Sequence, residues 1–197
     1  MADDGIKRHV REKYGDIARQ GGSCCAPGIC HDPAQAGARA GYEPEQLQAV
    51  PDQTNLGLGC GNPVTRAGLA QGETVLDLGS GPGLDALLAA KQVGPEGEVI
   101  GLDMTPDMIT RAEANAARDG AANVRFMQAD LERLPLPDNT ADVVLSNCVI
   151  NLCPDKRAVY REIFRVLKPG GRTCIADVLL ERPLPEHMAK DPKAWCA

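Results

Sequence analysis

A glycine-rich segment is the first place in this chain where residue types and spacing suggest chemistry. Residues 77–83 read Asp-Leu-Gly-Ser-Gly-Pro-Gly and follow the residues Thr-Val-Leu at 74–76. Glycine lacks a Cβ atom, so a loop of this kind lets the backbone approach a ligand closely. Its Gly-x-Gly-x-Gly spacing differs from the Gly-x-Gly-x-x-Gly of dinucleotide-binding loops. Alone, the segment predicts either a simple tight turn or a site for an adenosine-containing ligand.

Two carboxylates narrow the choice of ligand. Asp103 ends the next predicted strand, where it can accept hydrogen bonds from both hydroxyls of a ribose. Asp77 immediately precedes the loop, where its charge repels a pyrophosphate and attracts an ammonium group. S-adenosylmethionine carries a ribose, an ammonium group and a sulfonium but no phosphate. The charges therefore favour S-adenosylmethionine over a dinucleotide.

A third acidic residue, Asp130, follows the third predicted strand and precedes Leu131. Asp130 is suited to accept a hydrogen bond from an adenine amino group, and Leu131 to pack on the ring. The alternative for Asp130 is a helix cap or a solvated loop. The predicted cofactor-binding residues are Asp77, Gly79, Ser80, Gly81, Gly83, Asp103, Met104, Asp130, Leu131 and Asn147.

Cysteine is the other residue type that calls for an explanation, because the chain has eight. The ordinary explanation for a free cysteine is a small, buried apolar residue. That explanation is weak for Cys24, Cys25 and Cys60, which stand in glycine-rich segments that read as loops. Cys148 follows the fourth predicted strand, and the carboxyl ends of the strands form the ligand crevice in doubly wound folds. We therefore predict that Cys148 lies beside the cofactor.

Thiolates are ligands for soft ions. Zinc usually takes four ligands in Cys-x-x-Cys pairs, and the chain has no such pair; four residues separate Cys25 from Cys30 and Cys148 from Cys153. Scattered single cysteines fit a site with three thiolate ligands better. Trivalent arsenic binds three such ligands. Arsenic also keeps a lone pair that can attack a methyl group, so no general base is required, and we find no histidine at the predicted crevice.

The elements that must position these residues alternate between strand and helix. We predict strands at 74–78, 99–102, 124–127, 142–146 and 172–179. We predict helices at 4–19, 44–49, from Pro63, and at 84–93, 106–118 and 156–167. Such alternation is typical of a doubly wound α/β fold with a mainly parallel sheet, that is, a Rossmann-like fold.

The chain divides by composition into three parts. Residues 1–65 are predicted as an N-terminal extension with a helix and cysteine-bearing loops, and 66–180 as the cofactor-binding domain. Residues 181–197 end at Trp-Cys-Ala without a helix stop, so we expect an incomplete C-terminus, the start of a missing or truncated region.

Charge and composition exclude some partners. The net charge is −6 and aromatic residues make up 3% of the chain, which argues against nucleic acid. No apolar stretch reaches the ~18 residues of a membrane span, and the N-terminus has no apolar signal core. We expect a cytoplasmic monomer with reduced cysteines and no membrane association.

The segment Glu73–Gly83, with Asp103, Asp130 and the stretch Leu167–Gly171, resembles the class I S-adenosylmethionine methyltransferases. The narrower resemblance is to the arsenite methyltransferases, and it is carried by segments 14–18, 21–25, 55–63 and 146–152. It implies transfer of a methyl group from S-adenosylmethionine to thiolate-bound trivalent arsenic, for arsenic detoxification.

By that resemblance Cys60 and Cys148 bind arsenic, and Cys24 or Cys25 takes part in the first methylation and in a disulfide relay. Arsenite or its thiol conjugates are then the substrate, and thioredoxin or glutathione restores the thiols. The family's third ligand lies in a Trp-x-x-Cys stretch, whereas Cys196 directly follows the tryptophan here, so the third ligand stays open.

Other departures and alternatives remain. Leu58 stands where many members of that family have a tyrosine. Cys30 and Cys153 have no family role, although Cys153 is close enough to Cys148 to join a relay, and Cys174 reads as a core residue. The alternatives are a class I methyltransferase for a small organic acceptor, or a non-catalytic binder of arsenite and cofactor.

Overall fold

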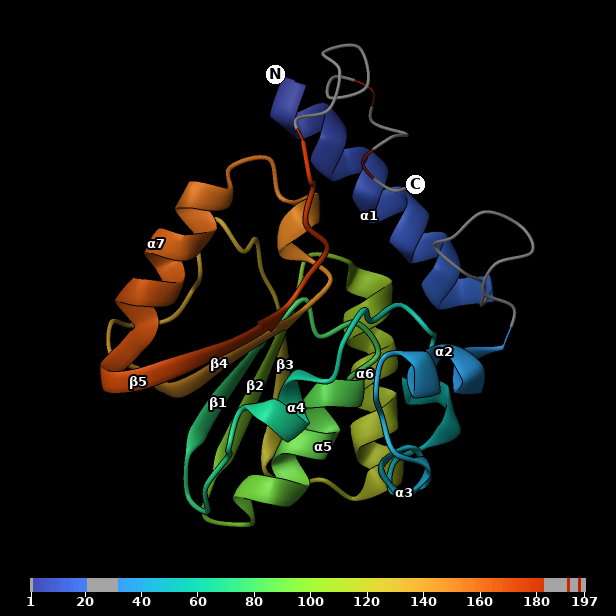
Figure 1. Cartoon of the computed structure of the whole chain (residues 1–197), viewed down its shortest axis with the longest axis vertical. Helices are drawn as coiled ribbons and strands as arrows, with labels where there is room; N and C mark the ends of the chain where they lie inside the picture. The colour runs from blue at the N-terminus through green and yellow to red at the C-terminus, as the bar shows by residue number, and fades with distance from the viewer. Residues whose placement is uncertain (1, 21–31, 183–190, 192–194, 196–197) are drawn as a thin grey trace.

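The computed structural model describes residues 2–20, 32–182, 191 and 195. In this part of the chain the architecture is a parallel sheet with helices on both faces (Figure 1). The strands are β1 (Thr74–Leu78), β2 (Glu98–Asp103), β3 (Val124–Gln128), β4 (Ala141–Asn147) and β5 (Leu167–Ala176).

The strand order is β3-β2-β1-β4-β5, and every pairing is parallel. The chain runs outward from β1 in one direction and then returns to start again on its other side with β4. The connections that leave the carboxyl ends of β1 and β4 therefore run in opposite directions. The crevice between these two ends is the switch point, where doubly wound folds bind ligands. The predicted fold class is confirmed.

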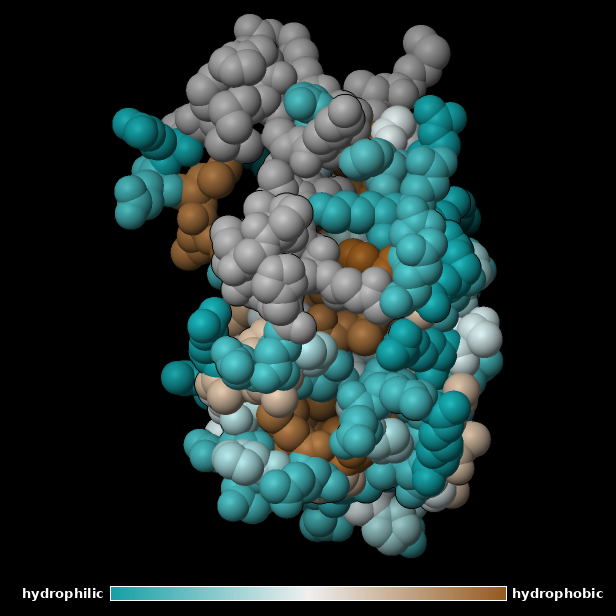
Figure 2. Space-filling model, turned by 90° about the vertical axis from the view of Figure 1, so that its right-hand side faces the viewer, coloured by the Kyte–Doolittle hydropathy of each residue, from teal (hydrophilic) through white to brown (hydrophobic). Residues whose placement is uncertain are grey.

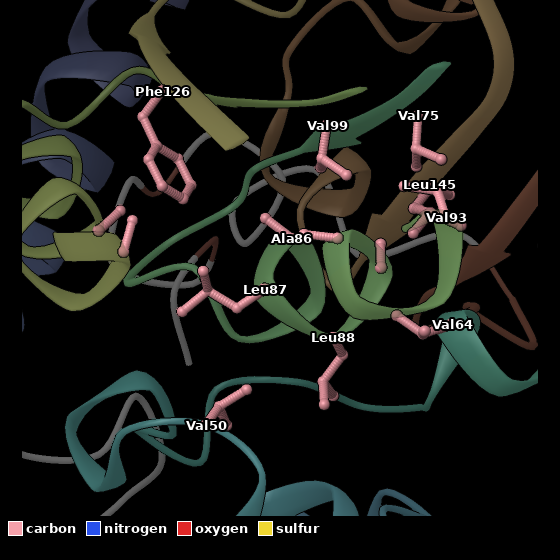
Figure 3. Close-up of a cluster of buried hydrophobic side chains, with 14 of the residues drawn as sticks. Val50, Val64, Val75, Ala86, Leu87, Leu88, Val93, Val99, Phe126 and Leu145 are labelled. Atoms are coloured by element: carbon pink, nitrogen blue, oxygen red, sulfur yellow. The ribbon is translucent and has the colours of Figure 1, made fainter. Parts of the chain in front are cut away.

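The two faces of the sheet are covered by different helices (Figure 1). Helices α5 (Leu84–Val93) and α6 (Pro106–Asp119) cover one face, and α7 (Lys156–Val166) covers the other. Side chains alternate along each strand, so Val75 packs toward α5 while Leu76 packs toward α7. Figure 3 shows the first of these two cores, in which Leu87 and Val93 of α5 meet the sheet.

Helix α1 (Ala2–Gln20) lies across the end of the molecule where the strands finish (Figure 1). Its buried side chains, Ile6, Val10 and Ile17, recur at helical spacing, as the sequence predicts. Val10 packs near Leu152, and Ile17 packs near Met108 of α6. This helix therefore stands against the switch point as a separate wall.

Short helices connect α1 to the sheet. They are α2 (Pro33–Arg39), α3 (Pro44–Gln48), η1 (Asp52–Thr54) and α4 (Pro63–Arg66). The predicted helices at 44–49 and from Pro63 are found, whereas α2 is not anticipated by the sequence analysis. Its N-cap is conventional, because the side chain of Asp32 accepts a hydrogen bond from the amide of Ala34.

Strand β5 differs from its prediction. It begins at Leu167 rather than at 172 and ends at Ala176 rather than at 179. Ala141 pairs with Leu167 and Val143 pairs with Arg172, so residues 168–171 form an irregularity within the strand. The stretch Lys-Pro-Gly-Gly reads as a helix stop, but here it is absorbed into the strand.

Among the described residues, no helix is long and apolar enough to cross a membrane. On the face drawn in Figure 2, polar side chains predominate and apolar side chains show mainly in the hollows between them.

Candidate active site

A cleft of about 1010 Å³, counting the space at its open mouth, lies at the carboxyl ends of β1, β2 and β4. Its floor is the loop that follows β1, and residues 54–59 line another side. Lys7, Val10 and Tyr14 of α1 contribute one wall. A cleft formed mostly by apolar groups with a few polar ones is typical of a small-ligand site.

All but one of the residues predicted to bind the cofactor line this cleft; the exception is Gly83, which lies behind the loop at the start of α5. The loop is held to the neighbouring strand, since the amides of Gly79 and Ser80 donate to the carbonyl of Leu102 at 2.7 and 2.9 Å. Gly79 has φ = +71°, and a Cβ atom there would lie 2.6 Å from Val149. No other residue fits this position without displacing the chain.

Asp77 is almost completely buried, with 2% of its surface exposed. Among the described residues, one of its carboxylate oxygens, Oδ2, has no hydrogen-bond partner. Burial, and then the charges of Asp85 and Asp103, raise the pKa of Asp77 well above its usual range. A cationic group entering the cleft would satisfy the free oxygen and offset this cost, so the site fits a ligand with an ammonium group.

Asp103 ties the loop to the end of β2. Its two carboxylate oxygens accept hydrogen bonds from the amides of Gly81 and Thr105 at 3.0 and 2.8 Å. The Thr105 side chain and the Met104 amide also bond to this carboxylate, so the hydroxyls of a ribose would share it with these groups. Burial raises the pKa of this carboxyl despite these bonds.

Asp130 lines the cleft, and it also stabilises a local turn, in keeping with the alternative prediction of a loop residue. It accepts from the amide of Glu132 at 3.0 Å, and it forms an ion pair with Lys7 of α1 at 2.6 Å. Leu131 is buried beside it, and Met104 packs against the apolar residues of α1. One acceptor position of Asp130 therefore serves the helix that closes the cleft.

Asn147, at the end of β4, connects the cleft to the loop that carries Cys60. Its side-chain oxygen accepts from the amide of Cys60 at 3.0 Å, and its nitrogen donates to Asp85 at 3.0 Å. The hydroxyl of Tyr42 donates to the same carboxylate at 2.6 Å. Burial raises the pKa of Asp85 to about 6. Neither Asp85 nor Tyr42 is predicted as a site residue from the sequence.

Two of the predicted arsenic ligands come together beside this network. The sulfur atoms of Cys60 and Cys148 and a carboxylate oxygen of Asp177 all lie within 4.8 Å of one another. Cys60 is exposed and follows Gly59, which lines the cleft together with Cys148. A Cβ atom at Gly61 would lie 2.5 Å from that of Ala176, so this glycine allows the Cys60 loop to reach the ends of the strands.

Cys148 adopts a left-handed backbone conformation, with φ = +58°, and its amide donates to the carbonyl of Ala176 at 2.8 Å. This turn directs the residue out of the strand toward the Cys60 loop. The adjoining thiol of Cys60 and then burial raise the pKa of Cys148. The Cys148 thiol is thus held in a protonated state close to the sulfur of Cys60.

The remaining cysteines separate into two groups. Cys24, Cys25, Cys30 and Cys196 lie outside the described residues. Cys153 lines the cleft, but burial raises the pKa of its thiol to about 12, which is unfavourable for a nucleophile in a relay. Cys174 packs against the core on the α5 side of the sheet, as predicted.

Residues 69–197 match the sequence profile described as a methyltransferase domain. The chain belongs to the methyltransferase domain family. It is 47% identical to an arsenite methyltransferase of Halobacterium salinarum and 39% identical to one of Aquipseudomonas alcaligenes. These alignments cover 93% and 92% of this chain but 50% and 53% of the relatives, so the chain spans about half the length of the curated relatives it matches.

A solved structure of a related protein is also similar to this chain. An arsenic(III) S-adenosylmethionine methyltransferase from Chlamydomonas reinhardtii is 41% identical in sequence and superposes with a TM-score of 0.63. The match covers 82% of this chain and 55% of that one. The doubly wound sheet of this methyltransferase domain is therefore the arrangement found in that protein.

Proposed function

We propose that this methyltransferase domain transfers a methyl group from S-adenosylmethionine to arsenite. One observation carries the proposal: two thiols from segments 88 residues apart, Cys60 and Cys148, meet beside a cleft whose buried carboxylates suit S-adenosylmethionine. The arsenite methyltransferases among its relatives support it.

The cleft residues divide the recognition of the cofactor among them. We assign the ammonium group to Asp77, because its unpartnered oxygen is buried next to the loop. We assign the ribose to Asp103, which lines the cleft at the end of β2, and the adenine to the place lined by Asp130 and Leu131. Bound there, S-adenosylmethionine supplies an electrophilic methyl group.

The two thiols hold the acceptor. Arsenite is As(OH)₃, and condensation with two thiols gives a bis-thiolate that keeps one hydroxyl and releases two water molecules. The hydroxyls of arsenite take up the thiol protons, so protonated cysteines are suitable starting groups. The arsenic lone pair is the nucleophile, and the chain's task is to hold it near the cleft, where proximity supplies much of the rate.

Asn147 positions Cys60 for this task. Its oxygen binds the amide of Cys60, and its nitrogen binds the carbonyl of Gly61 at 2.8 Å, so the loop is held from both sides. Because the same nitrogen donates to Asp85, the arsenic site and the cofactor cleft share one rigid support.

We further propose that the enzyme works in the cytoplasm as a monomer, with thioredoxin or glutathione restoring the thiols after turnover. In a reducing compartment the eight cysteines would stay free thiols and not form a disulfide framework. Cys24 and Cys25 are assigned to the disulfide relay by family resemblance alone.

The test is arsenic speciation by chromatography and mass spectrometry after incubation with arsenite, S-adenosylmethionine and a thiol. We expect Cys60→Ser and Cys148→Ser each to lower the yield of methylated arsenicals at least 100-fold, because a serine oxygen is a poor ligand for a soft ion. Both variants should bind S-adenosylmethionine as the wild type does.

Cys174→Ser is the matched control, since this thiol packs against the core on the α5 side of the sheet and is not one of the clustered groups. It should keep its activity. Full yield from both Cys60→Ser and Cys148→Ser would reject arsenite as the substrate and favour a small organic acceptor; cofactor and arsenite binding without any product from the wild type would favour a binder.

A further inference from the structure

Asp177 stands at the thiol cluster without a part in the reaction described so far. It directly follows β5, and one of its carboxylate oxygens lies within 4.8 Å of the sulfurs of both Cys60 and Cys148. The three groups come from three separate segments: the loop before α4, the end of β4 and the end of β5. A carboxylate beside two ligand thiols requires an explanation.

The carboxylate is held in a fixed orientation. One oxygen, Oδ1, accepts from the side chain of Asn151 at 2.6 Å and from the amide of Val178 at 2.8 Å. The other, Oδ2, accepts from the backbone amide of Asn151 at 3.1 Å. A carboxylate has about four acceptor positions, and these bonds fill three of them. Among the described residues these bonds leave one acceptor position, and one oxygen of this carboxylate lies within 4.8 Å of both sulfurs.

Arsenite bound to two thiols presents such a donor. When As(OH)₃ condenses with the thiols of Cys60 and Cys148, two As–S bonds form, two As–O bonds break, and two water molecules leave. The product keeps one As–OH group. Oxygen of a carboxylate is a poor ligand for a soft ion but a strong acceptor for a hydroxyl.

We infer that Asp177 accepts a hydrogen bond from the remaining arsenic hydroxyl and so makes the site selective for inorganic arsenite. This inference rests on the proposed function and specifies which arsenicals the site prefers. An organoarsenical with one carbon substituent also binds two thiols, but it then has no hydroxyl to offer. Asp177 is in this sense a specificity-determining residue of the acceptor site.

The experiment compares two arsenicals that need the same two thiols. Arsenite and phenylarsine oxide are titrated by calorimetry into the reduced wild type, Asp177→Asn and Asp177→Ala. We expect arsenite affinity to fall about tenfold in Asp177→Ala and less in Asp177→Asn, because a charge-assisted hydrogen bond is lost. Phenylarsine oxide affinity should stay within about twofold in both variants.

Phenylarsine oxide also reports on structural damage, because Asp177 binds the Asn151 segment that follows Cys148. Equal losses for both arsenicals would mean that Asp177 only supports the loop, and unchanged affinities for both would mean that it has no role; either result overturns the inference and leaves the proposed function standing. If the wild type binds neither arsenical through Cys60 and Cys148, the arsenic site and the inference both fall.

Discussion

Asp77 lines the cleft and is almost completely buried, and among the described residues one of its carboxylate oxygens has no hydrogen-bond partner. A buried charge without a counter-ion costs free energy in the unliganded protein. Removing the charge should therefore affect ligand binding strongly and the fold only weakly.

We expect Asp77→Asn to raise the Kd for S-adenosylmethionine at least tenfold, because an amide keeps the shape but not the charge that the ammonium group requires. Calorimetry on the purified variant measures this change. Asp119→Asn is a suitable control, since Asp119 pairs with Lys91 and does not line the cleft. An unaltered Kd in a folded Asp77→Asn would place the ammonium group elsewhere.

Some residues of the site can be predicted from the sequence and others cannot. The glycine loop and Asp103 follow from strand–loop–helix order, and Cys148 follows from its place after a strand. Asp85 left a weaker signal, as a charged residue within the otherwise apolar start of the helix at 84–93. Asp177 is not predicted as a site residue, because the predicted fifth strand runs to 179 and includes it.

Helix α1 is the element that completes the cleft without belonging to the sheet. Val10 is 1% exposed and packs near Leu152, and Lys7 reaches across to Asp130 and Glu132. The sheet and its two cores do not depend on these contacts. Displacing α1 should therefore open the site while the sheet stays folded.

We expect Val10→Asp to detach α1, because the new charge would be buried without a partner. Cofactor affinity should fall about tenfold, and trypsin should cleave α1 faster. Gln20→Asp adds the same charge to an exposed position of the same helix and should change neither measurement. If both variants behave like the wild type, α1 is not a wall of the functional site.

Elements with regular periodicity were predicted closely, and irregular ones were not. The helix at 84–93 and the strand at 74–78 agree with α5 and β1 residue for residue. Helix α2 is short, and its dense alanine and glycine content gives little periodicity. The start of β5 was missed because Pro169 and Gly170 usually end a helix, whereas tertiary pairing with β4 draws them into a bulged strand.

Taken as a whole, the molecule concentrates buried acids at one end of its sheet. Burial raises the pKa values of Asp77, Asp85 and Asp103. These groups hold protons more tightly when folded than when unfolded, so their contribution to stability is complete below about pH 4 and is lost as the pH rises through the folded pKa values.

Ion pairs give stability the opposite dependence on pH, but they do so at lower pH. The hydrogen bond from Arg172 lowers the pKa of Glu73, and this contribution to stability is lost as the pH falls below about 4. Between pH 5 and 8 the buried acids should therefore determine the slope of stability against pH.

We expect the Tm of the unliganded protein to be about 2 °C higher at pH 5.5 than at pH 8, since a pKa of about 6 for Asp85 means that about 1 kcal/mol of its contribution is lost over this range. Scanning calorimetry across this range measures the change. Saturating S-adenosylmethionine should flatten the profile by supplying a cation to Asp77. A Tm that is constant or rises with pH would contradict this account.

The left-handed backbone of Cys148 has a consequence for engineering. A side chain with φ = +58° costs about 1 kcal/mol relative to glycine. Sequence redesign that optimises stability alone would favour glycine at this position, and the resulting protein would fold better and lose one of its two clustered thiols. The cost at Cys148 thus marks a position where an improvement in the scaffold would remove the chemistry that the scaffold supports.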